Sequence, residues 1–532
     1  EHQADKLYDV MTDMVFSTSN TEQTLFESLL DARATHGGSH KIVEDINRQP
    51  IAYNRVIMGS FILGRKIARL TPKQKTVGVL LPNAIGALLT LFGLQAFGRV
   101  PAMLNFSTGA INMSAACIAA QVTTIVSSRK FVEAAEMEGD IAILSKNCQI
   151  IYLEDVRENV GTGDKLYGLF ARFFSRTALW LSKASKDPDS PAIILFTSGS
   201  EGVPKGVVLS HRNLNANRLQ AAARIGFSAQ DIVFNAMPMF HAFGLLGGTL
   251  LPVLSGVYSF FYPSPLHYKI VPELCYDTNA TVLYGTDTFL AGYARTANPY
   301  DFFSMRLIVS GAERVKQETR EVWMEKFGHR ILEGYGATEC SPVIAINTPM
   351  HNRSGSVGRL MDRIDYRLEH VEGIATGGRL FVKGPNVMLG YLRADNPGVI
   401  EAPADGWYDT GDIVAIDEQR YITILGRAKR FSKIAGEMVS LAAIESKLQQ
   451  AFADRQFAVV AIADPKKGEQ LVLFTTLEKP DRKALATELK SRGATELMVP
   501  KTIVSLQEIP LLGSGKTDYM TLTRLANDEA KE

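Results

Sequence analysis

Hydroxyl groups, glycines and one lysine are concentrated in a single stretch of this chain. The sequence FTSGSEGVPKGVVLSHRNL, from Phe196 to Leu214, follows an apolar strand signal at residues 192–196. Serine and threonine hydroxyls and exposed glycine amides bind phosphate oxygens, and Lys205 adds a positive charge. The stretch therefore predicts a phosphate-binding loop, with a glycine-rich turn that binds no ligand as the alternative.

The common phosphate loop of P-loop NTPases is excluded. That loop needs the pattern Gly-x-x-x-x-Gly-Lys-Ser/Thr, and this register is absent between Phe196 and Leu214. The sequence GSGKT at residues 513–517 resembles the end of such a loop, but Pro510 occupies the position of its first glycine. Too little chain follows this sequence to build the rest of a nucleotide-binding domain.

Four more motifs follow the first loop. They are LEGYGATECSP (332–342), WYDTGDI (407–413), ILGRAKRFSKIAGEMVS (424–440) and GSGKTD (513–518). In this order, the five motifs resemble the adenylate-forming superfamily of acyl-CoA synthetases, luciferases and peptide-synthetase adenylation domains. The resemblance covers nearly the whole chain from Thr24. The first loop and NAMPMFHAFGL (235–245) are most similar to the acyl-[acyl-carrier-protein] synthetase half of bifunctional acyltransferase–synthetases.

This resemblance implies a reaction in two steps. A fatty carboxylate is a poor electrophile because its oxygen does not leave, so ATP first converts it to an acyl-adenylate and pyrophosphate is released. Mg²⁺ is the implied metal, and Glu339, next to Thr338, would bind it because hard divalent ions prefer oxygen ligands. The phosphopantetheine thiol of an acyl-carrier protein would then displace AMP.

The resemblance also implies which residues bind the nucleotide. Tyr335 would stack on adenine, Asp412 would accept hydrogen bonds from both ribose hydroxyls, and Arg427 would donate to the same ribose. Glu201 departs from the family pattern, which usually has Thr or Ser there, because a carboxylate repels polyphosphate unless it points away or meets Mg²⁺. The other residues implied around the phosphates and the adenine are Thr197, Ser198, Gly199, Ser200, Gly202, Lys205, Gly311, Ala312, Glu333 and Gly334.

Residues near the C-terminus would serve the two steps in turn. By resemblance, Lys516 contacts the carboxylate and a phosphate oxygen during adenylation, as an electrostatic clamp. Backbone rotation at the hinge residue Lys429 would then withdraw Lys516 and bring Lys433 towards the adenylate. Gly436 would leave room for the phosphopantetheine arm.

His241 is expected to border the entrance for the acyl chain, with a buried core histidine as the alternative. The uncharged run that follows, from Phe243 to Tyr262, is long enough to cross a bilayer. Pro252 and four glycines within this run favour a buried core segment instead.

Strand and helix signals alternate through the first two-thirds of the chain. Apolar strand runs such as residues 76–82 precede helix-length runs such as residues 84–98. This order predicts an α/β fold with parallel-rich sheets covered by helices. We expect a large domain at residues 1–426, with a β-rich subdomain at about 355–426, and a small mobile α+β domain at residues 427–532.

Three helical segments are also expected. Two lie near residues 441–451 and 481–492, in the small domain. The third, at residues 163–187, predicts a basic amphipathic helix that lies in a membrane interface or docks on its own domain. Its apolar face would contain Leu166, Phe170, Phe173, Phe174 and Leu181, interleaved with Lys165, Arg172, Arg176 and Lys183.

The composition is that of an ordinary globular protein, with 57 Lys and Arg residues against 56 Asp and Glu residues. This balance gives no argument for a nucleic-acid partner. The four cysteines lack metal-site spacing and indicate reduced thiols in a cytosolic compartment. The chain begins with neither Met nor a signal pattern, which indicates a fragment or a processed chain. The resemblance implies that an acyltransferase domain lies before Glu1.

The preferred hypothesis is an AMP-forming acid–thiol ligase that loads a fatty acid onto acyl-carrier protein. The product would supply lysophospholipid reacylation, in the cytoplasm or at the cytoplasmic side of a bacterial inner membrane, with peripheral membrane contact. The alternatives are a long-chain fatty acid–CoA ligase, which shares the first step, and a non-catalytic acyl- or nucleotide-binding module. The presence of Lys516, Glu339 and Asp412 disfavours the non-catalytic module.

Overall fold

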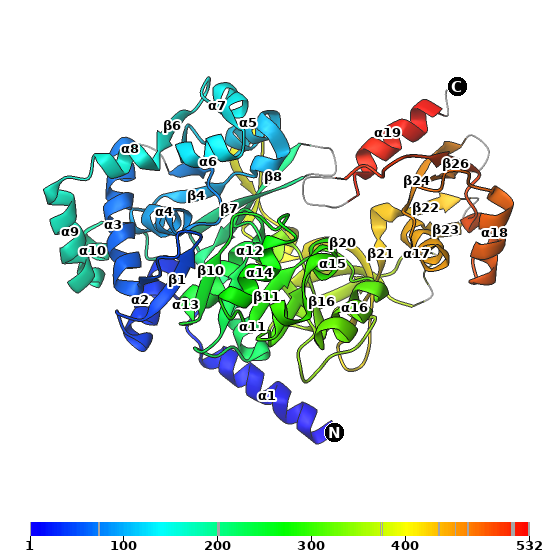
Figure 1. Ribbon diagram of the computed structural model, residues 1–532, viewed down its shortest axis with the longest axis horizontal. Coiled ribbons are helices and arrows are strands. Elements are labelled where there is room, and N and C mark those ends of the chain that lie inside the picture. The colour runs from blue at the N-terminus through cyan, green and yellow to red at the C-terminus, as the bar shows by residue number, and fades with distance from the viewer. Residues whose placement is uncertain are drawn as a thin grey trace. The chain divides into compact units, whose positions relative to one another are not determined.

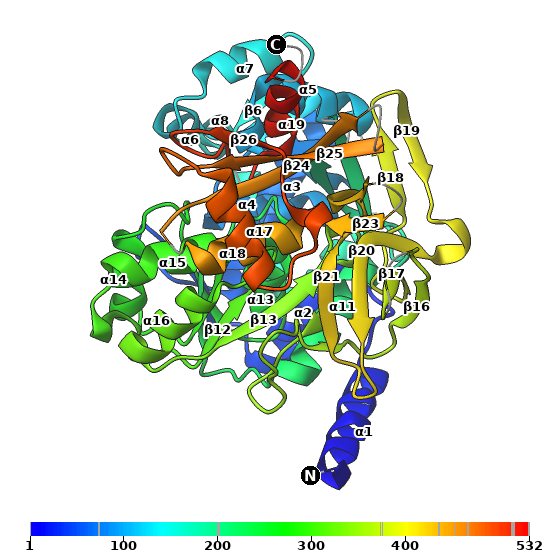
Figure 2. The same ribbon diagram turned by 90° about the vertical axis from the view of Figure 1, so that its right-hand side faces the viewer.

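The chain folds into two compact units (Figures 1 and 2). The first contains Glu1–Asp365 and Lys383–Tyr408, and the second contains Tyr366–Val382 and Asp409–Glu532. The domain boundary expected at residue 426 stays a prediction. The computed structural model describes residues 2–72, 75–182, 184–198, 203–372, 374, 376–434, 437–452, 454–464, 468–511 and 517–529.

A nine-stranded sheet forms one layer of the first unit. In spatial order its strands are β15 (Arg359–Leu360), β14 (Val343–Ile346), β13 (Ile331–Gly336), β12 (Leu307–Ser310), β11 (Val282–Gly285), β9 (Ile232–Asn235), β10 (Tyr258–Phe261), β1 (Lys41–Asp45) and β2 (Ile51–Ala52). The six strands from β13 to β1 are parallel, as the alternation of strand and helix signals predicts. The remaining strands are antiparallel and lie at the edges.

An eight-stranded sheet forms the other layer. Its order is β19 (Asn396–Glu401), β18 (Gly390–Arg393), β8 (Pro204–Ser210), β7 (Pro191–Ser198), β4 (Val100–Met103), β3 (Thr76–Val79), β5 (Thr124–Ser127) and β6 (Gln149–Tyr152). The strands from β7 to β6 are parallel, whereas β8, β18 and β19 pair antiparallel. The long β7–β8 hairpin therefore brings the predicted phosphate loop to one edge of the parallel strands.

The two sheets share one apolar core with several of the helices around them (Figure 1). Buried Val43 and Phe261 of the first sheet belong to the same cluster as Val77 and Ile193 of the second. Besides the segments at residues 162–181 and 242–254, the α-helices of this unit are α1 (His2–Thr18), α2 (Leu25–His36), α3 (Tyr53–Leu70), α4 (Ile85–Ala96), α5 (Gly109–Ala119), α6 (Arg129–Ala134), α7 (Glu138–Leu144), α8 (Leu153–Glu158), α11 (His211–Ile225), α14 (Ile270–Asp277), α15 (Asp287–Thr296) and α16 (Gln317–Phe327). The helices that contribute to the shared core include α2, α3, α4 and α11.

The uncharged run from Phe243 to Tyr262 is part of this core. It forms α12 (Ala242–Leu245), the π-helical segment η2 (Leu246–Leu250), α13 (Leu251–Leu254) and then β10. A Cβ added to Gly244 would lie 2.3 Å from the carbonyl oxygen of Met237, so the backbones approach too closely for a side chain. The core interpretation is confirmed. Among the residues that the structure describes, no helix combines the length and apolarity that a bilayer crossing requires.

The sequence predicts one amphipathic helix at residues 163–187, but the structure has two helices there. α9 (Thr162–Phe173) and α10 (Ser175–Leu181) meet at Phe174, whose ψ of 48° interrupts the helix. Arg33 holds the break, because its guanidinium donates to the carbonyl oxygen of Arg172 (2.8 Å) and the hydroxyl of Ser175 (3.2 Å). Leu181 therefore lies on a different helix from Leu166.

The second unit contains two smaller sheets. One has the order β16 (Asp365–Glu369), β17 (Gly378–Lys383), β20 (Tyr408–Ile416) and β21 (Ile422–Arg427). The other has the order β23 (Glu437–Ser440), β22 (Phe431–Ile434), β25 (Gly468–Thr475) and β24 (Phe457–Asp464), with β26 (Thr502–Ser505) beside β25. Helices α17 (Leu441–Ala451) and α18 (Arg482–Ser491) confirm the two predicted helices; α19 (Tyr519–Glu529) follows them.

Alternating residues of β24 explain why helices pack on both faces of the five-stranded sheet. Val459 belongs to the cluster that contains Ile444 of α17 and Leu489 of α18. Its neighbour Val460 belongs to the cluster that contains Leu522 of α19. Side chains of successive strand residues point to opposite faces, so one apolar strand supports both layers.

Candidate active site

The predicted phosphate loop joins β7 to β8. Thr197 and Lys205 are paired across the two strands, and Ser198 ends β7 opposite Pro204. The predicted ligands Gly199, Ser200 and Gly202, together with Glu201, lie outside the described residues. The strand register therefore fixes both ends of the loop and places Thr197 and Lys205 side by side at its base.

Tyr391 connects Lys205 to the predicted metal ligand Glu339. The Lys205 ammonium group lies 5.7 Å from the centre of the Tyr391 ring, within the range of a cation–π interaction. The Tyr391 hydroxyl in turn donates a 2.6 Å hydrogen bond to Oε1 of Glu339. The first unit therefore brings a cation, a phenol and a carboxylate together from β8, β18 and the 3₁₀ turn η4 (Thr338–Cys340).

The surroundings keep the Tyr391 phenol protonated. Burial, followed by the negative charge of Glu339, raises the pKa of Tyr391 above its usual value. The same two causes, in the same order, raise the pKa of Tyr408, which is hydrogen-bonded to Tyr391. Both phenols therefore remain donors, and one of them holds a nearly buried carboxylate in place.

Glu339 itself is held by its backbone. Its carbonyl oxygen accepts a 2.8 Å hydrogen bond from the amide of Met388, and the next carbonyl, of Cys340, accepts one of 2.8 Å from the Asn386 side chain. Thr338 is half-buried beside it. Tyr391, Met388 and Asn386 were not predicted as site residues, because none belongs to a motif and each is at least 46 residues away in sequence from its partner.

The predicted adenine slot lies where two neighbouring parallel strands end. Ser310 of β12 is paired with Glu333 of β13, so the turn at Gly311 and Ala312 runs beside Gly334. A Cβ on Gly311 would lie 3.7 Å from the carbonyl oxygen of Gly334. The carboxyl ends of parallel strands are where α/β proteins bind nucleotides.

Two residues predicted in this slot have features that the sequence does not show. Glu333 directs its carboxylate to the amide of Val315 (2.7 Å) and forms an ion pair with Arg320. Its side chain therefore has a structural role, and only its backbone remains for the slot. Ala312 has a φ of +69°, a left-handed conformation that costs a non-glycine residue energy and is often found at functional sites. Tyr335 is buried next to Gly334.

The predicted ribose ligands lie opposite each other in the second unit. Asp412 of β20 is paired with Arg427 of β21, and Arg427 Nε lies 3.0 Å from Oδ1 of Asp412. Asp412 is 4% exposed, whereas the Arg427 side chain is 69% exposed. Gly411 allows the turn before Asp412, because its φ of +69° suits glycine. The carboxylate is thus nearly buried, while the arginine that pairs with it is largely exposed.

His241 lies at the start of α12, in an apolar part of the first unit. Its ring centre is 4.7 Å from that of Phe240, and the histidine is half-buried. Phe243, two residues further, is 3.6 Å from the position of a Cβ on Gly311. The segment predicted to border the acyl chain therefore adjoins the turn predicted to border the nucleotide.

The remaining predicted residues belong to the second unit. Lys429 lies in the 3₁₀ turn η6 (Ala428–Arg430), and Lys433 lies in β22. Gly436 and Lys516 lie outside the described residues. The roles predicted for these four residues stay predictions.

Two family comparisons cover most of the chain. Residues 68–392 match the AMP-binding enzyme family, and residues 443–516 match the AMP-binding enzyme C-terminal domain. The long-chain-fatty-acid–CoA ligase of Salmonella typhimurium is 31% identical over 353 residues, which are 64% of this chain and 62% of that enzyme. The medium-chain fatty-acid–CoA ligase of Escherichia coli K12 is 28% identical, over 65% of this chain and 63% of that enzyme. The chain thus spans about three fifths of the length of these curated relatives.

Solved structures share the fold. ATP-bound MatB from Rhodopseudomonas palustris has a TM-score of 0.81 at 24% identity and covers 96% of this chain and 99% of its own. The o-succinylbenzoate CoA synthetase MenE from Bacillus subtilis, in complex with ATP and a magnesium ion, has a TM-score of 0.76 at 20% identity, covering 92% and 98%. Because the family match at residues 68–392 includes the phosphate loop, Glu339 and Tyr391, the chain belongs to the AMP-binding enzyme family.

Proposed function

We propose that this chain activates a fatty acid with ATP and passes the acyl group to a thiol. A carboxylate oxygen attacks the α-phosphorus of ATP, an O–P bond forms, and pyrophosphate leaves with the electron pair of the broken bond. A thiolate then attacks the acyl carbon, the C–O bond to phosphate breaks, and AMP leaves. The observation that carries the proposal is the arrangement of Lys205, Tyr391 and Glu339 at the base of the phosphate loop.

Within the first unit, each part of this arrangement has a task. Lys205 and Thr197 would bind the triphosphate, because the hairpin register keeps both at the base of the loop. Positioning the reactants and neutralising phosphate charge are the main needs of such a reaction. Tyr391 would act as a positioning residue, since its hydrogen bond fixes the orientation of the Glu339 carboxylate.

The groups around Glu339 fit a magnesium ion that arrives with the nucleotide. Glu339 offers a carboxylate and Thr338 a hydroxyl, and hard divalent ions prefer such oxygen ligands. The described part of the chain contains no cluster of three or more His, Cys, Asp or Glu side chains able to hold a metal. Phosphate oxygens and water would therefore supply the other ligands, and bound Mg²⁺ would reduce the repulsion between the phosphates and the incoming carboxylate.

The adenine and the ribose each have candidate ligands in the chain. Tyr335, with the turn at Gly311 and Ala312, would contact the base. Asp412 would accept hydrogen bonds from the ribose hydroxyls, and exposed Arg427 can shift to donate to the same sugar. The names of the ATP-bound fold relatives support a nucleotide at this family's site.

A fatty acid is the substrate best supported. The segment that begins at His241 is almost wholly apolar, and Phe243 stacks edge-on against buried Tyr284 with ring centres 5.5 Å apart. An apolar lining suits an acyl chain, because burial of each methylene contributes about 0.8 kcal/mol. Relatives named as long-chain and medium-chain fatty-acid–CoA ligases support the same class.

The acceptor thiol distinguishes two versions of the proposal. The relatives' names support coenzyme A, so a fatty acid–CoA ligase is the better supported version. The resemblance of the first loop and of NAMPMFHAFGL favours acyl-carrier protein as the acceptor instead. The acylated carrier protein would then supply lysophospholipid reacylation. One assay distinguishes the two acceptors. The protein is incubated with fatty acid, ATP and equal amounts of coenzyme A and acyl-carrier protein, and the thioester products are identified by mass. A product on coenzyme A alone eliminates the carrier-protein version, and a product on carrier protein alone eliminates the ligase version.

A non-catalytic module that binds nucleotide or acyl chains is the second candidate. It would retain the fold but release no pyrophosphate from ATP and fatty acid. Pyrophosphate release above the level of a Glu339→Gln variant would exclude it. Equal, background release from both proteins would exclude the enzyme.

We also propose that α9 and α10 contact an anionic membrane surface, from which fatty acids could be taken up. Lys165 is exposed between the apolar residues of α9, and the Arg172 guanidinium lies 5.5 Å from the ring centre of Phe173. Basic residues among exposed aromatic ones are typical of helices that bind anionic interfaces. The exposed apolar residues, each at least 45% exposed, are Leu166, Leu169, Phe173, Phe174, Trp180 and Leu181.

A further inference from the structure

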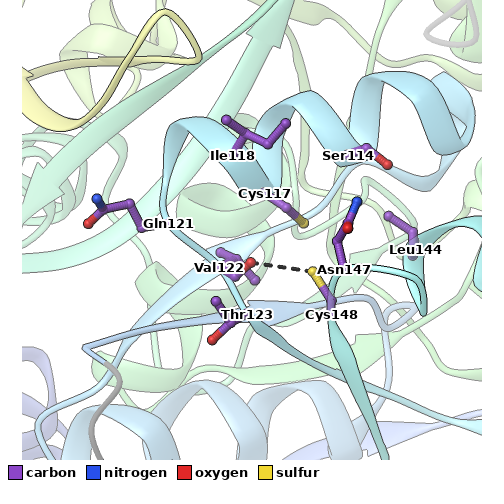
Figure 3. Close-up of a pocket in the computed structure, with 9 residues that line it drawn as sticks. All are labelled: Ser114, Cys117, Ile118, Gln121, Val122, Thr123, Leu144, Asn147 and Cys148. Carbon is purple, nitrogen blue, oxygen red and sulfur yellow. Dashed lines mark hydrogen bonds between the residues drawn. The ribbon is translucent and has the colours of Figure 1, made fainter.

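Two of the four cysteines line one cavity in the first unit. Cys117 lies in the last turn of α5, and Cys148 immediately precedes β6. The cavity has a volume of about 390 Å³ and reaches the surface between exposed Ile118, Gln121 and Asn147 (Figure 3). No residue that lines it belongs to the candidate active site.

The two thiols interact with each other. Figure 3 shows both sulfur atoms directed towards the same point of the cavity. The side chains of Cys117 and Cys148 are hydrogen-bonded to each other, and the Cys148 thiol donates a 3.3 Å hydrogen bond to the carbonyl oxygen of Val122. The chain from Cys117 to Cys148 to Val122 therefore gives the two sulfurs different roles.

This asymmetry makes Cys148 the stronger nucleophile. The hydrogen bond with Cys117 lowers the pKa of Cys148, and burial opposes this effect. The same hydrogen bond, reinforced by burial, raises the pKa of Cys117. Because the thiolate is the reactive form, Cys148 should react first and Cys117 second.

The other two cysteines neither line this cavity nor have a lowered pKa. Cys275 and Cys340 are fully buried, and burial raises the pKa of each well above its usual value. They are matched controls within the same chain.

We propose that Cys148 is a peroxide-sensitive thiol and that Cys117 resolves its oxidised form into a disulfide. The Cys148 thiolate attacks one peroxide oxygen, the O–O bond breaks, hydroxide leaves, and Cys148 becomes a sulfenic acid. The Cys117 sulfur then attacks the Cys148 sulfur, the S–O bond breaks, and water leaves with the Cys117 proton. Hydrogen peroxide is reduced to water, and the two thiols are oxidised to one disulfide.

The full chain, reduced and then desalted, is exposed to a small excess of hydrogen peroxide and digested without reductant. Mass mapping should find one cross-linked peptide pair, joining Cys117 to Cys148, with a loss of two hydrogen atoms. Cys275 and Cys340 should remain as thiols. A mixture of cross-links, or oxidation that starts at Cys275 or Cys340, would overturn the proposal.

Single variants separate the two roles. Cys117→Ser should stop at the sulfenic acid, which dimedone traps at Cys148, whereas Cys148→Ser should give neither adduct nor cross-link. Cys275→Ser should still form the native cross-link, as a control for the substitution itself. Dimedone labelling of Cys117 in the Cys148→Ser variant, at the rate seen for Cys148, would contradict the assigned order. Alkylation of the unmodified chain gives an independent check, because Cys148 should react with iodoacetamide before the other three.

Discussion

The phenol of Tyr391 donates a 2.6 Å hydrogen bond to the carboxylate of Glu339, across 52 residues of sequence. The same ring lies beneath the Lys205 ammonium group. One strand of the eight-stranded sheet thus links the phosphate loop to the carboxylate that we propose for magnesium. Burial raises the pKa of the phenol, so the donor is retained through the neutral pH range.

Tyr391→Phe tests this link. The substitution removes a hydrogen bond to a charged group, worth about 1.5–3 kcal/mol, and leaves the ring in place. We expect the kcat of adenylation to fall by about 10- to 100-fold and the concentration of Mg²⁺ needed for half-maximal rate to rise. Tyr300→Phe, at an exposed tyrosine, is the control. A lower kcat with an unchanged Mg²⁺ requirement would mean that Tyr391 does not position the metal ligand.

Asp412 and Arg427 should contribute unequally to the binding of ATP. Asp412→Asn removes a charged acceptor from a nearly buried position, and we expect the KM for ATP to rise by about tenfold, the effect of about 1.4 kcal/mol. Arg427→Gln removes the exposed partner, so stability should change little, because exposed ion pairs contribute about 0–1 kcal/mol. Thermal unfolding and ATP titration measure both effects. A larger loss of ATP affinity in Arg427→Gln than in Asp412→Asn would contradict the assignment.

Lys516→Ala should separate the two half-reactions. Loss of one charge contact in the transition state costs about 3 kcal/mol, or about 10²-fold in rate. We expect that loss in adenylation and a much smaller one in thioester formation from supplied acyl-adenylate. Lys490→Ala, in the same unit, is the control. Equal losses in both half-reactions would remove the clamp role.

The buried imidazole of His211 should make the free energy of unfolding fall at acidic pH. Burial lowers the pKa of His211 to about 4, and its Nδ1 accepts a 3.1 Å hydrogen bond from the amide of Leu25. In the unfolded chain His211 therefore binds a proton below about pH 6.5, whereas in the folded chain it binds one only below about pH 4. The contribution of His211 is complete above about pH 6.5 and falls by about 3 kcal/mol between these two values.

The measurement is denaturant unfolding at intervals from pH 7 to pH 5. His211→Gln should flatten the decline in the free energy of unfolding over this range, whereas His370→Gln, at an exposed histidine, should leave it unchanged. An equally steep decline in His211→Gln and in the original chain would show that His211 does not titrate in this way.

Vesicle flotation tests the α9–α10 surface. Phe173→Ser should lower binding to phosphatidylglycerol vesicles by about tenfold, because burial of a phenylalanine contributes about 1.5–3 kcal/mol. Lys165→Glu should weaken binding at low salt only, since each basic residue near an anionic surface contributes about 1 kcal/mol. Phe303→Ser, at an exposed phenylalanine of the same unit, is the control. Equal binding by the Phe173 and Phe303 variants would show that the surface does not insert.

Sequence patterns predicted the elements that local physics determines. A helix was predicted near residues 441–451, and in the structure Ser440 caps the N-terminus of that helix. Alternation of strands and helices predicted the parallel sheets. The break between α9 and α10 was missed, because the group that stabilises it, Arg33, is 139 residues from Arg172.

The candidate site was predicted only in part, for the same reason. Motifs singled out Lys205, Glu339 and Asp412, since each lies within a short pattern of residues, and their roles stay predictions. Tyr391 was missed because its partner Glu339 lies on a 3₁₀ turn that is 52 residues away in the sequence. Glu333 was placed in the adenine slot, although its carboxylate is engaged by Arg320 and the Val315 amide.

The exchange of labelled pyrophosphate into ATP tests the central claim most directly. Reversible formation of an acyl-adenylate predicts exchange that requires both a fatty acid and Mg²⁺. It should be lost in Glu339→Gln and retained in Glu325→Gln, at an exposed glutamate. Exchange that proceeds without fatty acid, or cleavage of ATP to ADP and phosphate, would contradict the account.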